Sequence, residues 1–271
     1  MKKINRRSFL AAAGLTAAAL ALTACGGSAS STASSTASSA ASSEAASTSA
    51  AAELTTVEAG KLTMATNATF PPYEMTTDSG EIEGIDVDTA KAIAEKLGLE
   101  LQIDDMDFDA ALLSVQQGKA DIVMAGVTVT DERKAVMDFS DSYATGIQSI
   151  IVPEGSDITS PDDLAGKKIG TQRGTTGYIY CSDDFGDENV VAYDDGLTAV
   201  QALNNGQVDA VVIDNAPAQE FIAANPGLVI LDTSYAEEDY AIGMAKGSSL
   251  EDAVNAALEE LKADGTLQSI V

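Results

Sequence analysis

"AALLSVQQGKADIVMAG", residues 110–126, combines the two kinds of periodicity that decide the fold of this 271-residue chain. Its first half has apolar residues at helical spacing and closes with Gly118, a typical helix stop. Its second half, after Asp121, is an apolar run that predicts a buried strand. A helix followed directly by a buried strand is typical of an α/β protein.

The same arrangement returns in "LTAVQALNNGQVDAVVID", residues 197–214. When Gly118 is aligned with Gly206, Gly126 falls on Asp214. Open α/β sheets bind ligands beyond the carboxyl ends of their strands. We therefore expect two similar α/β lobes, with Gly126 and Asp214 at matching strand ends on either side of a cleft.

Three further elements fit this class. Residues 61–66 predict a strand, and residues 86–98 predict a helix that starts at an Asp and stops at Gly98. A C-terminal helix is expected to begin near Ser248 or Ser249, where "SSLED" resembles a capping box with Asp252 at its third helical position.

Composition excludes several kinds of function. With 42 acidic and 15 basic residues the net charge is −27, which disfavours nucleic acid and anionic lipid surfaces as partners. The chain has no histidine, so Ser-His-Asp machinery and imidazole metal sites are excluded. We expect no metal and no cofactor.

The N-terminus has the pattern of a secretory signal. Four basic residues within residues 1–9 precede an uncharged apolar run over residues 10–24. The run ends in "LTAC", residues 22–25, which resembles a bacterial lipoprotein lipobox. That resemblance implies a signal peptide over residues 1–24 and acylation of Cys25; the alternative is a plain secretory signal with a stray cysteine. "RRSFL" also resembles a twin-arginine signal, and the export route stays open.

A low-complexity segment follows the signal. Residues 26–52 contain only Gly, Ser, Ala and Thr apart from Glu44, a composition that cannot bury apolar area. We therefore predict a flexible linker over residues 25–53 that carries a lipid anchor on Cys25. The expected location is the extracytoplasmic face of the cell membrane. Cys181, the other cysteine, would then have no internal disulfide partner, and its role stays open.

Three short motifs contain candidate binding residues, each with a structural alternative. Arg133 ends "TVTDER" and is either a solvated arginine or a site residue. Thr175, in "GTQRGTTG", begins a helix, where it supplies donors to an anion or serves only as an N-cap. Phe70 and Tyr73, in "ATFPPYE", form the floor of a pocket or pack in a core.

The order of these motifs resembles one family along the whole body of the chain. The resemblance is carried by "ATFPPYE", "GIDVDTAKAIAEKLG", "FDAALLSVQQGKADIVMAGVTVTDERKAVMDFSDSY", "DLAGKKIGTQRGTTG", "NNGQVDAVVID" and "DYAIGMAKGSSL". These occur in extracellular solute-binding proteins of the polar amino-acid class, the capture subunits of ABC importers. The resemblance implies a monomer that works with membrane permease subunits.

The resemblance also implies the fold: a two-lobed, periplasmic-binding-protein-like α/β architecture of type II. Its two hinge strands would cross near residues 144–148 and 239–243. Lobe 1 is then expected over residues 54–147 and 239–271, and lobe 2 over residues 148–238.

Family contacts carry over to this chain position by position. A guanidinium meets a carboxylate through two parallel hydrogen bonds, and the carboxylate-binding arginine of the family falls on Arg133. The other implied ligand contacts are Thr175 and Thr176 for the carboxylate, Asp214, Gly126 and Thr128 for the ammonium group, and Phe70 and Phe108 around the side chain.

Asn67 and Gln172 are the implied specificity positions. Relatives that select lysine- or arginine-like ligands have an acid at the position of Asn67, so the sequence favours an L-amino acid with a neutral polar side chain. Arg173 is a further candidate for the side-chain pocket, with a surface position as its alternative.

Two other functions remain as alternatives on the same fold. A dehydratase-like enzyme would need a general acid or base in the cleft, but Asp214 is already assigned to the ammonium group. A sensory module is the second alternative. We expect a binding protein without catalytic residues.

Overall fold

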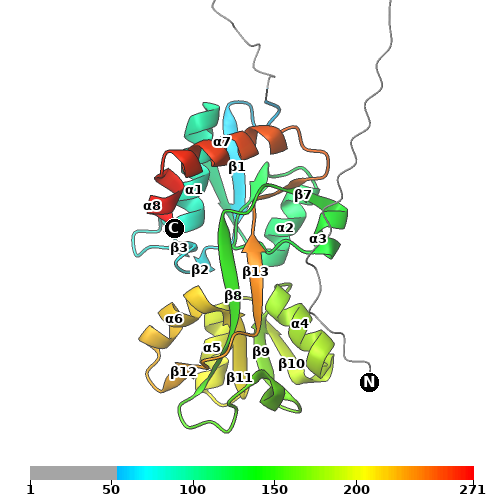
Figure 1. Ribbon diagram of the computed structural model, residues 1–271, viewed down its shortest axis with the longest axis vertical. Helices are drawn as coiled ribbons and strands as arrows, with labels where there is room; N and C mark the ends of the chain where they lie inside the picture. The colour runs from blue at the N-terminus through cyan, green and yellow to red at the C-terminus, as the bar shows by residue number, and fades with distance from the viewer. Residues whose placement is uncertain (1–53) are drawn as a thin grey trace, which may run out of the picture. The chain divides into compact units, whose positions relative to one another are not determined.

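Two β-sheets organise residues 54–271, which are the residues that the computed structural model describes (Figure 1). The predicted signal peptide, the linker and Cys25 lie outside the described residues. Each sheet is the centre of one lobe, and we name them lobe 1 and lobe 2 in chain order.

Lobe 1 has a five-stranded sheet in the order β5-β1-β6-β14-β7. β1 runs parallel to β5 and β6, whereas β14 is antiparallel to both of its neighbours. The bounds of these strands are Lys61–Thr66 (β1), Glu100–Asp105 (β5), Ile122–Val123 (β6), Met137–Phe139 (β7) and Gly243–Ala245 (β14). A small sheet beside it joins β2 (Thr69–Phe70), β3 (Glu74–Thr76) and β4 (Ile82–Glu83).

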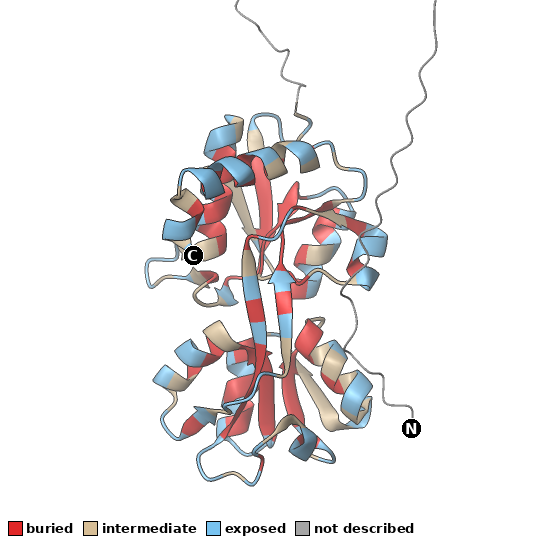
Figure 2. Ribbon diagram, in the orientation of Figure 1, coloured by how far each residue is buried: buried red, intermediate tan, exposed pale blue. Residues whose placement is uncertain are grey.

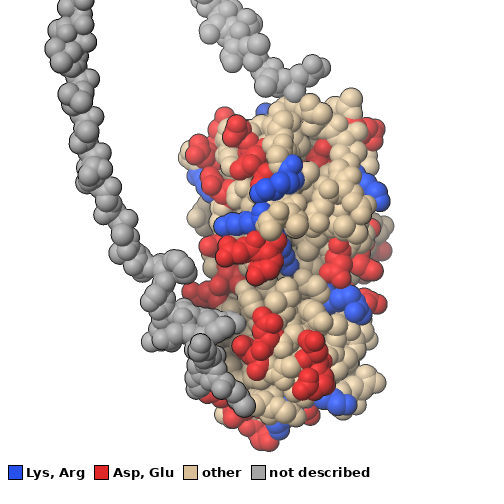
Figure 3. All heavy atoms as spheres, turned by 90° about the vertical axis from the view of Figure 1, so that its right-hand side faces the viewer, with Lys and Arg blue, Asp and Glu red and all other residues tan. Residues whose placement is uncertain are grey.

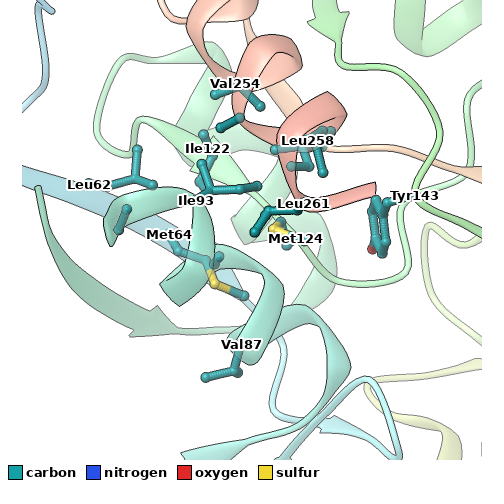
Figure 4. Packing of buried hydrophobic residues seen from close by; sticks show 14 of the residues in the cluster. Leu62, Met64, Val87, Ile93, Ile122, Met124, Tyr143, Val254, Leu258 and Leu261 are labelled. Carbon is teal, nitrogen blue, oxygen red and sulfur yellow. The ribbon is translucent and has the colours of Figure 1, made fainter. Parts of the chain in front are cut away.

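Five helices belong to lobe 1: α1 (Ile85–Leu97), α2 (Phe108–Gln116), α3 (Asp131–Val136), α7 (Glu251–Ala263) and α8 (Thr266–Ile270). The apolar faces of α1 and α7 pack with residues of β1 and β6 in one buried cluster. Figure 4 shows Ile93 of α1 and Leu261 of α7 turned toward the same interior as Met64 of β1. This core holds the lobe 1 strand ends in place.

Lobe 2 has a six-stranded sheet in the order β10-β9-β11-β8-β12, with β13 also paired to β8. Its strands are β8 (Ala144–Pro153), β9 (Ile169–Gln172), β10 (Val190–Tyr193), β11 (Ala210–Asp214), β12 (Leu228–Ile230) and β13 (Ala236–Tyr240). Its helices are α4 (Thr176–Phe185), α5 (Gly196–Asn204) and α6 (Asn215–Ala224), with the short 3₁₀ helices η1 (Pro161–Leu164) and η2 (Asp187–Asn189).

The chain passes between the two lobes along β8 and β13, which run antiparallel to each other (Figure 1). Their register pairs Ala144 with Tyr240 and Gln148 with Ala236. Along the crossing, buried and exposed residues alternate on both strands (Figure 2). Two α/β lobes joined by two strands were predicted from the sequence, and this architecture is confirmed. The predicted lobe boundaries fall within these strands.

The internal repeat has a structural counterpart in each lobe. Gly118 and Gly206, which follow α2 and α5, have φ angles of 66° and 67°. In each copy the Asp three residues later accepts from a backbone amide at the parallel strand that neighbours its own strand in the sheet, β1 in lobe 1 and β9 in lobe 2. Asp121 accepts from the Thr63 amide and Asp209 from the Lys168 amide, at 2.7 and 2.8 Å.

Two predicted helix starts are wrong. α1 begins at Ile85 with Gly84 as its N-cap and no side-chain cap, and Asp86 is instead fully buried. α7 begins at Glu251 with Leu250 as its N-cap, so "SSLED" forms no capping box. In both cases tertiary contacts position the helix start, and they override the local capping signal.

The surface is mainly acidic. Figure 3 shows Asp and Glu side chains spread over both lobes of one face, with Lys and Arg between them. Within residues 54–271, no helix combines the length and apolarity needed to cross a bilayer.

Candidate functional site

One cavity lies between the lobes and brings together all ten residues that the sequence predicted for the site. Its lining comes from strand ends, helix starts and the crossing strands: Asn67, Phe70, Glu74, Phe108, Ala125, Gly126, Thr128, Arg133, Gln148, Gln172, Thr175, Thr176, Val212, Ile213, Asp214 and Tyr240.

Arg133 lies on α3 with only 8% of its surface exposed. Its Nη1 donates to the Thr128 carbonyl over 2.8 Å, and its Nη2 donates to the Gly174 carbonyl of lobe 2 over 3.2 Å. The guanidinium also lies over the Phe108 ring, 5.4 Å from its centroid. Burial lowers the pKa of Arg133, with Glu238 opposing, yet a guanidinium stays charged at neutral pH. Because two carbonyls use only two of its five donors, it can still bind a carboxylate.

The N-terminus of α4 faces the same cavity from lobe 2. Thr175 is the N-cap, and its hydroxyl accepts from the Tyr178 amide and donates to the Gln172 carbonyl. Thr176, the first residue of the helix, is buried. Free backbone amides at a helix start attract anions, so this wall and Arg133 make a site for one carboxylate.

Asp214 is at the end of β11, where its carboxylate also caps α6. It accepts from the amides of Ala216 at 3.0 Å and Ile147 at 2.7 Å, and from the Tyr240 hydroxyl. Burial raises the pKa of Asp214, and these three donors oppose that rise. The donors hold the carboxylate in a fixed orientation at the cavity wall, where it can accept from an ammonium group.

Gly126 is the lobe 1 counterpart of Asp214, as the repeat predicted. It has a φ of 55°, and a Cβ there would lie 2.8 Å from the Phe70 ring and 3.2 Å from the Tyr240 ring. Its amide donates to Asp86 over 3.0 Å. Thr128, buried beside it, pairs with Tyr240 through an isolated bridge. Because glycine has no Cβ, the Phe70 and Tyr240 rings can pack against the backbone just after strand β6.

Asn67 and Gln172 contact each other across the cleft. Gln172 Nε2 donates to Asn67 Oδ1 over 2.8 Å, and Asn67 Nδ2 donates to the Met106 carbonyl over 2.9 Å. Both side chains are buried. They line the cavity, but their amide groups are largely used by protein partners.

Six cavity residues were not predicted from the sequence, and three of them are polar: Glu74, Gln148 and Tyr240. Glu74 is fully buried, and no donor group reaches either of its carboxylate oxygens. Gln148 Nε2 donates to the buried Glu238 over 2.9 Å, while its own oxygen has no partner. The sequence signal for Glu74 was its place directly after the aromatic residues of "ATFPPYE". Gln148 and Tyr240 gave no signal beyond their positions on the crossing strands.

Arg173 does not line the cavity. Its side chain is 55% exposed and forms an ion pair with Asp194 at 3.4 Å. Cys181 is buried in α4, where burial raises the pKa of its thiol to about 12, so it is unreactive at neutral pH. Among residues 54–271, no cluster of three or more acidic, cysteine or histidine side chains could hold a metal ion.

The chain is similar to known proteins of one family. The model of the bacterial extracellular solute-binding proteins, family 3, matches residues 62–271. The chain is 32% identical over 275 residues to a probable histidine-binding protein of Neisseria gonorrhoeae, covering 98% of this chain and 95% of that one.

Two solved structures are similar to the described residues. One is the arginine-, lysine-, histidine-binding protein ArtJ of Geobacillus stearothermophilus, with a TM-score of 0.74 and 35% identity over 78% of this chain and 93% of that chain. The other is an ancestral arginine-binding protein bound to glutamine, with a TM-score of 0.74 and 43% identity over 78% of this chain and 96% of that chain. The family match spans both lobes and every residue of the cavity, so the chain belongs to the bacterial extracellular solute-binding proteins of family 3.

Proposed function

We propose that this protein captures an L-α-amino acid in the cavity and delivers it to the permease of an ABC importer. One observation carries the proposal: a buried guanidinium and a buried carboxylate, Arg133 and Asp214, line one cavity from different lobes. Arg133 and the start of α4 would bind the ligand carboxylate, and Asp214 would bind its ammonium group. Because both lobes contribute, the ligand favours the closed state.

We further propose that the side chain of the ligand is cationic, as in arginine or lysine. Glu74 is a buried carboxyl group in the cavity wall without any donor, so its ionised form needs a counterion, which a cationic ligand side chain would supply. The neutral polar side chain that the sequence favoured is not confirmed. Asn67, on which that expectation depended, has its amide engaged by Gln172 and Met106.

The relatives are consistent with this choice. One solved relative is described as binding arginine, lysine and histidine, and another as an arginine-binding protein that was bound to glutamine. Amino acids with cationic side chains and with neutral polar side chains therefore both need to be tested for binding. Retention at the cell membrane through Cys25 remains part of the proposal.

The test is titration calorimetry of the purified protein with arginine, lysine, histidine, glutamine and cystine. We expect cationic amino acids to bind most tightly, with dissociation constants on the order of micromolar. Arg133→Ala should weaken every ligand by about 2–5 kcal/mol, because the carboxylate loses its buried partner. Arg173→Ala, a change of the exposed arginine, is the matched control and should bind normally.

Glu74→Gln tests whether Glu74 binds the ligand side chain, separately from the binding of the ligand carboxylate by Arg133. It should weaken arginine and lysine selectively and leave glutamine nearly unchanged. Equal losses for all ligands would contradict the cationic assignment, and wild-type affinity in Arg133→Ala would contradict the cavity as the site. Conversion of a bound amino acid during incubation, seen by mass spectrometry, would favour the enzyme alternative.

A further inference from the structure

Two carboxyl groups, Glu74 on β3 and Asp86 on α1, lie side by side at the cavity. Both are fully buried; Glu74 lines the cavity, whereas Asp86 does not. The start of α1 brings them together, because the Asp86 amide donates to the carbonyl of Tyr73, the residue before Glu74, over 2.9 Å. The two carboxyl groups are close enough to form a hydrogen bond with each other.

Hydrogen-bond donors of the protein surround Asp86 but not Glu74. Asp86 accepts from the Tyr143 hydroxyl over 2.6 Å and from the Gly126 amide over 3.0 Å. Glu74 accepts from no N–H or O–H group of its protein surroundings. Ionised carboxylates only accept, so two that face each other need a proton between them. Asp86 is therefore the ionised member of the pair in the free protein, and Glu74 holds the proton.

The charged surroundings of the pair are almost all acidic. Asp105 on β5 and Asp214 on β11 add negative charge, and the nearby hydroxyls of Tyr73, Tyr143 and Tyr240 are neutral. Among the described residues, Arg133 is the only buried Lys or Arg, and its guanidinium bonds to two backbone carbonyls. Consistently, burial and then Asp86 raise the pKa of Glu74 well above its ordinary range, and burial raises the pKa of Asp86 to about 6.

We propose that the cavity exchanges the proton shared by Glu74 and Asp86 for the cationic side chain of its ligand, so that pH selects between cationic and neutral amino acids. This inference rests on the proposed function, and it adds Asp86 as a specificity-determining residue behind the cavity wall. When arginine or lysine enters, the proton leaves Glu74 for the solvent and the ligand cation replaces it, so the net charge at the pair is unchanged. A neutral side chain such as that of glutamine leaves the proton in place.

The deciding experiment is calorimetric titration of the wild-type protein with L-arginine in two buffers that differ in ionisation enthalpy. Between about pH 5 and pH 8, we expect the release of about one proton per arginine bound, and affinity that rises by up to about tenfold per pH unit until the free pair is ionised. Glutamine, where it binds, should release no proton and gain no affinity with rising pH.

Arginine binding without proton release at any pH in this range would overturn the inference and leave the proposed ligand class intact. Failure of every cationic amino acid to bind would instead overturn the proposed ligand class. The two failures are therefore distinguishable in the same titrations.

Asp86→Asn tests the residue behind the wall. Without the neighbouring charge, the pKa of Glu74 should fall, although burial still raises it, so arginine should still bind and proton release should end at a lower pH than in the wild type. Asp88→Asn, two residues further along α1 and exposed, is the matched control and should release the proton as wild type does. If Asp86→Asn does not fold, Tyr143→Phe removes one donor to Asp86 and should move the arginine pH profile. A wild-type profile in the folded variant would overturn the role of Asp86.

Discussion

Two buried amides, Asn67 of lobe 1 and Gln172 of lobe 2, form a direct side-chain link across the cleft. Asn67 Oδ1 also accepts from the Thr69 hydroxyl over 3.0 Å. Because the Asn67 side chain has several protein partners, it contributes more to holding the two lobes together than to recognising the ligand side chain. We therefore expect the amide pair to affect the affinity for all ligands rather than the choice among them.

Gln172→Ala tests this expectation. Loss of the interlobe hydrogen bond should reduce the affinity for each amino acid by a similar amount, about 1–2 kcal/mol, without changing their ranking. The measurement is calorimetry with the same ligands, and Gln219→Ala, an exposed change on α6 of lobe 2, is the control. A selective loss for one side-chain class would show that Gln172 reads the ligand after all.

Single residues differ in how well the sequence could predict them. Arg133 and Asp214 follow strands whose ends the repeat and the motifs had located, so their positions could be predicted. The burial of Glu74 and Asp86 could not be predicted, because acidic residues are rarely fully buried, and the aromatic residues before Glu74 mark its place but not its burial. Their burial depends on how the start of α1 contacts the turn before β3.

The contact between the start of α1 and the turn before β3 depends on one glycine, Gly84. The amides of Ile85 and Asp86 donate to the carbonyls of Pro72 and Tyr73, at 3.0 and 2.9 Å. Gly84 precedes them with a φ of 135°, and a Cβ at this position would lie 2.3 Å from the Tyr73 carbonyl oxygen. The obstacle is backbone, so it cannot rotate away as a side chain would.

Gly84→Ala should therefore be among the most destabilising single changes in lobe 1. We expect a loss of roughly 3 kcal/mol or more in the free energy of unfolding, from the backbone clash and the strained φ together. Gly80→Ala is the matched control: its φ is 85°, but nothing lies within 4 Å of the added methyl, so it should lose only about 1 kcal/mol. Equal losses in urea unfolding would contradict the clash as the cause.

Helices and strands were predicted better than their ends. Strand β1 and the bodies of α1, α2 and α7 follow from apolar periodicity, which tertiary packing preserves. The starts of α1 and α7 do not follow from it, because Asp86 is drawn into a buried polar cluster and Ser248 lies outside the helix. Caps are local signals, and contacts from distant segments override them.

For the molecule as a whole, the buried acid pair makes stability depend on pH. The pKa values of Glu74 and Asp86 are higher in the folded protein than in an unfolded chain. Their contribution to folding is therefore complete below about pH 4 and is lost as pH rises through the folded-state values. Asp138, Asp163 and Asp264, which are not buried, have lowered pKa values, so their effect is confined to more acidic solutions.

We predict that the ligand-free protein loses stability on the order of 2 kcal/mol between about pH 5 and pH 7. Differential scanning calorimetry across this range measures the loss, and saturating arginine should reduce it. Glu74→Gln should reduce the pH dependence to the part that comes from Asp86, whereas Glu95→Gln, an exposed change on α1, should leave it unchanged. Stability that is constant or rising over this range in the wild type would contradict the prediction.

The two-lobed organisation was predictable because the repeat spans both halves of the chain. What periodicity could not give was the arrangement across the cleft. The partners there, such as Gln172 with Asn67 and Arg133 with Gly174, come from different lobes and share no local pattern.

The sheet order of lobe 1 has a consequence for how the protein is made. β14, at residues 243–245, lies inside that sheet between β6 and β7, although all of lobe 2 precedes it in the chain. Until β14 has been synthesised, β7 has no neighbour in the sheet, so lobe 1 stays unfinished until after lobe 2 has been made. A chain that crosses a membrane during synthesis would therefore have no completed lobe 1 to be pulled apart while lobe 2 is being translocated.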